Sequence, residues 1–214
     1  MREVDRRKIQ RRIESIKERL EKLRTHRAQL RSGRRQKGLR QVALVGYTNA
    51  GKSTLLNALT GADAYVEDRL FATLDPKTRI YEDGQSPSIL FTDTVGFIRD
   101  LPHGLVKAFH ATLEEVLEGD LIVILLDVSD ERYPEQRQVV EKVLEELGAG
   151  SNPKLIVLNK ADLLCEAERV RVQEAFPGGV VVSAIKKQGL KELILAVRRA
   201  LAPQACFPAE NSSG

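Results

Sequence analysis

Cysteine and histidine are scarce in this chain, and long apolar runs are missing. The two cysteines, Cys165 and Cys206, have no metal-ligand spacing, so we expect the reduced structural thiols of a cytosolic protein. The three histidines, His26, His103 and His110, are scattered, which disfavours a histidine-based metal or catalytic site. No apolar run approaches the length of a membrane span, and the amino-terminal segment is too charged for a signal peptide. These absences predict a cytoplasmic protein without a membrane span.

The most informative segment that is present is an apolar stretch, residues 42–45, that runs into Gly-x-x-x-x-Gly-Lys-Ser. This pattern is typical of the phosphate-binding loop of P-loop nucleotide hydrolases. Gly46 and Gly51 let the backbone bend so that successive N–H groups face a phosphate. Lys52 brings positive charge to the β- and γ-phosphates, and the Ser53 hydroxyl can ligate Mg²⁺. The predicted phosphate-binding residues are Gly46, Tyr47, Thr48, Asn49, Ala50, Gly51, Lys52, Ser53 and Thr54.

A second apolar stretch, residues 154–158, ends in Asn159-Lys160-Ala161-Asp162. The Asp162 carboxylate can accept both the ring N–H and the exocyclic amine of guanine, a donor pair that adenine lacks. The Lys160 stem can lie over the base, and Asn159 can tie this loop to the phosphate loop. A further strand ends in Ser183-Ala184, where a backbone N–H can meet the guanine O6. The predicted base-binding residues are Asn159, Lys160, Ala161, Asp162, Ser183, Ala184 and Ile185.

Between these motifs lie the parts of a nucleotide switch. Asp93-Thr94-Val95-Gly96 has the Asp-x-x-Gly pattern, in which Asp93 holds Mg²⁺ through water and the Gly96 N–H senses the γ-phosphate. Thr73 is the candidate that completes the Mg²⁺ shell with Ser53. The switch residues predicted to contact GTP are Phe71, Ala72, Thr73, Leu74, Asp75, Asp93, Thr94, Val95 and Gly96.

Strand and helix patterns alternate between residues 41 and 202, which predicts one GTP-binding α/β domain. Expected strands are 41–45, 79–82, 89–92, 121–127, 154–158 and 180–182, and expected helices are 51–59, 103–117, 134–147, 166–176 and 189–201. Asp83-Gly84 indicates a hairpin, so one edge strand should run antiparallel. The predicted fold is a P-loop NTPase with a doubly wound, mostly parallel six-stranded sheet and ligand loops at the carboxyl ends of its strands.

The net charge of +4 conceals two regions of opposite sign. Residues 1–40 contain 16 Lys and Arg against 5 Asp and Glu, a balance of +11, so the rest of the chain carries −7. We expect a basic amphipathic helix over 1–31, a linker over 32–40 and a disordered tail over 203–214. An apolar seam along this helix calls for a partner helix: Ile9, Ile13, Ile16, Leu20, Leu23 and Leu30. The basic face is either a solvated surface or a contact for RNA phosphates.

Three longer motifs resemble the HflX family of ribosome-associated GTPases: GYTNAGKST (46–54), LFATLDP (70–76) and DTVGFIRDLPH (93–103). The segment ATLEEV (111–116) continues the match, which runs from about Val4 to Leu201. The resemblance implies a GTPase that binds the large ribosomal subunit and its rRNA and splits stalled or idle ribosomes. The resemblance also implies a separate domain before the basic helix, of which we expect this chain to hold only the end.

The sequence assigns phosphate stabilisation to Lys52 but identifies no residue that positions the attacking water. Phe97 stands where many signalling GTPases have a glutamine, so we expect slow intrinsic turnover that the ribosome stimulates. The alternative is that Phe97 packs in a switch core and another residue positions the water. Asn49 matches the phosphate-loop asparagine of GTPase families that use K⁺ in place of an arginine finger. The other interpretation is that Asn49 only hydrogen-bonds within its loop.

Three functions are compatible with this fold: a hydrolysing GTP switch on ribosomes, a nucleic-acid-binding module with a vestigial G domain, and an ATPase. Asp162 argues against an ATPase. A vestigial domain would be expected to have lost Lys52, Ser53, Asp93 or Asp162, and all four are present. The predicted function is therefore the GTP switch, with Mg²⁺ and a possible K⁺ as cofactors.

Overall fold

The computed structural model describes residues 33, 38–61, 77–85, 88–94, 96, 116–117 and 119–202. The chain divides into two units, Met1–Leu39 and Arg40–Gly214, and the description below concerns the second. Several predicted features lie outside the described residues: the basic helix, most of the linker, nearly all of the helix expected at 103–117, and the tail.

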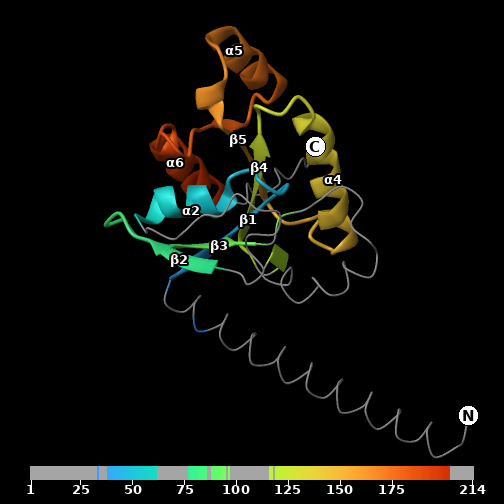
Figure 1. Cartoon of the computed structure of the whole chain (residues 1–214). Coiled ribbons are helices and arrows are strands. Elements are labelled where there is room, and N and C mark those ends of the chain that lie inside the picture. Colours follow the sequence, from blue (N-terminus) through green and yellow to red (C-terminus); the bar gives the residue numbers. More distant parts are fainter. Residues whose placement is uncertain are drawn as a thin grey trace, which may run out of the picture. The chain divides into compact units, whose positions relative to one another are not determined.

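The centre of the domain is a six-stranded sheet with the order β2-β3-β1-β4-β5-β6 (Figure 1). The strands are β1 (Arg40–Gly46), β2 (Lys77–Tyr81), β3 (Ile89–Asp93), β4 (Leu121–Asp127), β5 (Lys154–Asn159) and β6 (Val180–Val181). All neighbouring pairs are parallel except β2 and β3, which are antiparallel. The predicted sheet, including its antiparallel edge strand, is confirmed.

Strands β1, β3 and β4 form because apolar runs suit a sheet that is covered on both faces, whereas the edge strand β2 has the sequence KTRIY and is mostly exposed. Successive residues of β4 point alternately into two separate cores, Leu121, Val123 and Leu125 into one and Ile122, Ile124 and Leu126 into the other. Two helices cover the first face, α2 (Lys52–Thr60) and α6 (Leu190–Leu201). The second face is covered by α4 (Tyr133–Glu146) and α5 (Glu166–Ala175).

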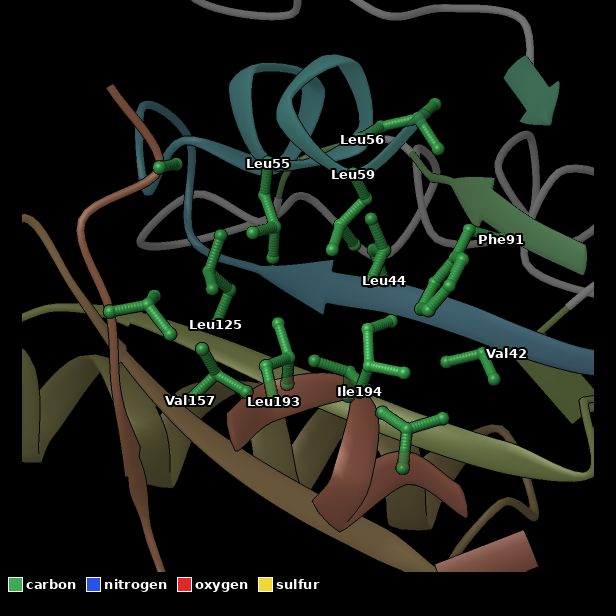
Figure 2. Close-up of a cluster of buried hydrophobic side chains, with 14 of the residues drawn as sticks. Val42, Leu44, Leu55, Leu56, Leu59, Phe91, Leu125, Val157, Leu193 and Ile194 are labelled. Carbon is green, nitrogen blue, oxygen red and sulfur yellow. The ribbon is translucent and has the colours of Figure 1, made fainter. Parts of the chain in front are cut away.

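The core beneath α2 and α6 fixes the start of the phosphate loop. Figure 2 shows Leu55 of α2 and Ile194 of α6 in one buried cluster with Leu44 of β1. Each of these side chains is at most 6% exposed. Burying side chains of this size contributes about 1.5–3 kcal/mol each, so the strand that leads into the loop is firmly held.

The amino end of β1 is pinned to the residue before β4. The Gln41 N–H donates to Asp120 Oδ2 at 2.9 Å, and Arg40 Nη1 lies 3.5 Å from Asp120 Oδ1. The Asp120 N–H in turn donates to the Gln41 carbonyl at 2.8 Å. These reciprocal contacts fix the point at which the chain enters the domain.

Some element boundaries differ from the expected ones. β2 begins at Lys77, two residues before the expected start, because Lys77 pairs with Asp93 at the end of β3. β6 has only two residues, since Ser183 leaves the ladder to form an isolated bridge with Gln188. α6 starts after Gly189, whose left-handed φ of 72° and closeness to the Val181 carbonyl exclude a side chain. Within the described part of the chain, no helix has the length and apolar character that crossing a membrane requires.

Candidate guanine-nucleotide site

The phosphate loop joins β1 to α2 at the carboxyl end of the central strand. A Cβ at Gly46 would collide with the Leu125 carbonyl oxygen, and a Cβ at Gly51 would collide with Asn159 Nδ2. Gly51 also has a left-handed φ of 92°. Both positions therefore require glycine, and the N-terminus of α2 directs its N–H groups towards the loop.

Lys52 is the first residue of α2, directly after this loop, and is only 7% exposed. Its ammonium donates to the Gly46 carbonyl at 3.3 Å and to the Tyr47 carbonyl at 3.1 Å. Burial lowers the pKa of Lys52 to about 8, and the negative charge of Asp93 partly opposes that shift. The ammonium is thus held where a phosphate bound in the loop would meet it.

Ser53 and Asp93 come together although they are 40 residues apart: the Ser53 hydroxyl donates to Asp93 Oδ2 at 2.5 Å. Asp93 is the last residue of β3 and is fully buried. Mg²⁺ prefers oxygen ligands and commonly keeps several waters. A hydroxyl and a carboxylate from two rigid elements fit that preference, so these residues can hold the ion that the motifs imply.

The beginning of the switch segment is anchored against β1 and the phosphate loop. Thr94 is buried, and its hydroxyl donates to the Leu44 carbonyl at 2.7 Å. A Cβ at Gly96 would lie 3.0 Å from Lys52 Nζ and 3.0 Å from Thr48 Cα. Gly96 is therefore tightly packed beside the Lys52 ammonium. Its contact with the γ-phosphate stays a prediction.

Asn159 connects three loops. Its Nδ2 donates to the Ala50 carbonyl at 2.8 Å, and its Oδ1 accepts the Ala184 N–H at 3.0 Å. The side chain is 2% exposed. The tie between Asn159 and the phosphate loop, predicted from sequence, is present, and the link to the Ser183-Ala184 loop is an additional finding.

The base-binding side of the site is arranged around Asp162. The Ser183 hydroxyl donates to Asp162 Oδ1 at 2.6 Å and accepts the Lys186 N–H at 3.1 Å. Because the Ala184 N–H is already bonded to Asn159, it is not the obvious donor for a guanine O6. Ile185 is 71% exposed, and its N–H donates no hydrogen bond to another backbone group of the described residues.

Asp127 was not identified from the sequence. Its Oδ2 lies 2.7 Å from Lys160 Nζ. The available signal was its place at the end of an apolar strand, since β4 and β5 pair in a register that sets Asp127 beside Asn159.

Seven of the residues that the sequence analysis singled out lie outside the described part of the chain: Phe71, Ala72, Thr73, Leu74, Asp75, Val95 and Phe97.

A central parallel strand, a glycine-bounded phosphate loop and an Asn-Lys-x-Asp loop tied to it define a P-loop GTPase domain. Consistent with this class, residues 41–160 match the family described as 50S ribosome-binding GTPase. The chain belongs to this family and, within it, to the HflX GTPases. GTPase HflX of Caldanaerobacter subterraneus subsp. tengcongensis is 51% identical over 203 residues, which are 93% of this chain and 45% of the relative.

Two further comparisons agree. GTPase HflX of Gluconacetobacter diazotrophicus is 47% identical over 181 residues, 85% of this chain and 40% of the relative. The chain thus spans less than half of the length of these two relatives. Among solved structures, Era in complex with MgGDPNP and nucleotides 1506–1542 of 16S ribosomal RNA has a TM-score of 0.63 and 26% identity. That match covers 81% of this chain and 60% of Era.

Proposed function

We propose that this chain binds GTP and GDP with Mg²⁺, hydrolyses GTP, and acts as a switch on the large ribosomal subunit in ribosome splitting or rescue. Nucleotide binding is supported above all by the two hydrogen bonds of the Asn159 side chain, one to Ala50 of the phosphate loop and one to Ala184 of the Ser183-Ala184 loop. A phosphate site and a base site are thereby held at a fixed separation. Such preorganisation lowers the cost of binding one particular nucleotide.

The proposed roles follow from the contacts. Lys52 exchanges its two carbonyl partners for the β- and γ-phosphates, and the Gly96 N–H contacts the γ-phosphate. Asp162, with one oxygen oriented by Ser183, accepts the two guanine donors. The N–H of Ile185, an exposed residue, is the candidate donor for O6. Ser53 and Asp93 hold Mg²⁺, Asp93 through water, with Thr73 as the proposed additional ligand; bound Mg²⁺ neutralises phosphate charge.

Hydrolysis is proposed to be slow in the isolated chain because Phe97 cannot hydrogen-bond the attacking water. K⁺ is proposed to supply positive charge at the phosphates through Asn49. Asn49 is exposed, has a left-handed φ of 63°, and its side chain forms no hydrogen bond with the described residues. This supports the K⁺ interpretation over a purely local role for Asn49.

The ribosomal part rests on family membership and on charge. Relatives that are named GTPase HflX match most of this chain, and residues 1–40 carry a balance of +11. A segment of that charge favours RNA phosphates. The solved Era complex, which contains MgGDPNP and 16S rRNA, supports combined nucleotide and RNA binding in a related fold. The arrangement of Lys52, Ser53 and Asp93 opposes a vestigial G domain.

The test is cosedimentation of the chain with purified 50S subunits in the presence of GDP, a non-hydrolysable GTP analogue, or no nucleotide. We expect binding that is strongest with the GTP analogue, together with GTP turnover that rises when 50S subunits are added. The variant Lys52→Ala is the control for the nucleotide dependence. Nucleotide-independent sedimentation without any GTP turnover would instead favour the nucleic-acid-binding module.

A further inference from the structure

Lys160 of the Asn-Lys-x-Asp loop has a fixed ionic partner outside every recognised nucleotide motif. Its Nζ lies 2.7 Å from Asp127 Oδ2, and the two side chains are 26% and 15% exposed. The Lys160 backbone has a left-handed φ of 65°, a conformation that few residues other than glycine adopt. The backbone and the ammonium of Lys160 are thus both constrained, and the stem between them is expected to lie over the base.

The carboxylate of Asp127 is itself held in place. Its Oδ1 accepts the Ser129 N–H at 3.1 Å and the Ser129 hydroxyl at 2.5 Å, which leaves Oδ2 for Lys160. Val128, which follows Asp127 in the chain, donates its N–H to the Asn159 carbonyl at 3.1 Å. Asp127 is therefore part of a turn that is bonded to the base-binding loop, and its position does not depend on Lys160 alone.

We propose that Asp127 is a positioning residue for guanine nucleotides: it holds the Lys160 stem as a preformed platform for one face of the base without touching the nucleotide. The inference rests on the proposed nucleotide site. A lysine has a flexible four-carbon stem, and ordering it costs conformational entropy. When Asp127 orders that stem before binding, the nucleotide does not have to do so.

The effect should appear mainly in the rate of nucleotide release, since most affinity differences between related complexes lie in the dissociation rate. A partly exposed ion pair of this kind corresponds to roughly a fivefold change in affinity. We therefore expect Asp127→Asn to release a fluorescent GDP analogue about fivefold faster than the unchanged chain. The turnover at saturating GTP should stay within about twofold.

The matched control is Asp130→Asn, the same chemical change in the same turn. Asp130 pairs with Arg132 and Gln136 rather than with Lys160, so its variant should release GDP at the unchanged rate. A double-mutant comparison with Lys160 gives a second test. Lys160→Met keeps an unbranched stem but removes the ammonium, so adding Asp127→Asn to it should accelerate release by less than about 1.5-fold.

Inosine diphosphate separates a platform from an effect on the edge of the base. It lacks the exocyclic amine that Asp162 accepts but offers the same ring face. Asp127→Asn should weaken the binding of GDP and inosine diphosphate by the same factor. A changed ratio, additive effects of Asp127→Asn and Lys160→Met, or an unchanged release rate would each overturn the proposal.

The experiments distinguish the role of Asp127 from nucleotide binding itself. If the unchanged chain binds no GDP, both the role of Asp127 and the proposed function are wrong. If it binds GDP with Mg²⁺ and Asp127→Asn has no effect, only the role of Asp127 falls. Should Asp127→Asn fail to fold, as judged by circular dichroism, Lys160→Met decides, because it must by itself accelerate release about as much.

Discussion

Asn159 Nδ2 donates a hydrogen bond of 2.8 Å to the Ala50 carbonyl, across 109 residues of sequence. Both groups are buried, so neither can exchange its partner for bulk water. The bond is therefore a structural part of the domain as well as part of the candidate site. It joins the base-binding loop and the phosphate loop into one structural unit.

Replacing Asn159 by Ala should lower both stability and nucleotide affinity. The change leaves the Ala50 carbonyl and the Ala184 N–H without this partner, which costs about 1–3 kcal/mol per group. We expect a reduced free energy of unfolding in urea and at least about tenfold weaker GDP binding. Asn152→Ala is the control, because Asn152 bonds the Leu117 and Gly119 carbonyls at the other end of the strands. Asn152→Ala should lower the free energy of unfolding but leave GDP affinity unchanged. Equal losses of GDP affinity in both variants would contradict the placement of Asn159 in the nucleotide site.

Asp162→Asn should shift the preference from guanine towards xanthine nucleotides. An amide presents a donor where the carboxylate had only acceptors, and xanthine carries an oxygen where guanine carries its amine. Competition titration with GDP, XDP and ADP measures the change. Asp83→Asn is a matched control in the β2–β3 turn, where Asp83 pairs with Arg198. Unaltered base preference in Asp162→Asn would remove Asp162 from its proposed role.

The buried ammonium of Lys52 predicts a pH dependence of stability in nucleotide-free protein in EDTA. Its pKa is lowered from 10.5 to about 8 in the folded chain. Between these values the unfolded chain binds a proton that the folded chain does not, so stability rises with pH. The contribution is about 3 kcal/mol over the whole interval. Urea unfolding from pH 7.5 to 10 should give a steeper rise for the unchanged chain than for Lys52→Met. Parallel curves would show that burial does not shift this group.

K⁺ should accelerate GTP turnover relative to Na⁺ at equal ionic strength, if Asn49 ligates the ion. A bound monovalent cation places positive charge where transition-state charge develops. Asn49→Ala should remove the preference for K⁺ while GDP affinity changes by less than about threefold. Identical rates in the two salts would exclude the idea, as would an alanine variant that still prefers K⁺.

Removing residues 1–31 should flatten the salt dependence of 50S binding. Counterion release scales with the number of phosphate contacts, so fewer basic residues give a smaller slope of log K against log salt. GTP affinity should stay nearly unchanged, because the site residues Lys52 and Asp162 belong to the separate unit Arg40–Gly214. A slope that does not change would mean that the segment is a packing helix.

The inner strands were predictable because they are nearly continuous apolar runs, and the edge strand β2 because Asp83-Gly84 indicates a hairpin. The loops were predictable because Lys52 and Asp162 belong to motifs with specific chemistry. Asp127 was not predictable in the same way. A lone aspartate after a strand has no motif, and its pairing with Lys160 depends on the register of β4 and β5. The engagement of the Ala184 N–H by Asn159 likewise depends on distances that a sequence does not contain.

The attachment of the amino end of β1 to Asp120 bears on whether the phosphate loop can influence the basic segment. The basic segment joins the domain at Arg40, whereas the phosphate loop begins at Gly46, at the other end of the same strand. Seven extended residues separate the two points by about 20 Å, and six of those residues are buried. Because β1 is buried and paired with β3 and β4 on its two sides, we expect it to keep its position when a phosphate is lost. The basic segment should therefore contribute the same ribosome affinity in the GTP and GDP states, and any difference between those states should originate in the loops around the nucleotide.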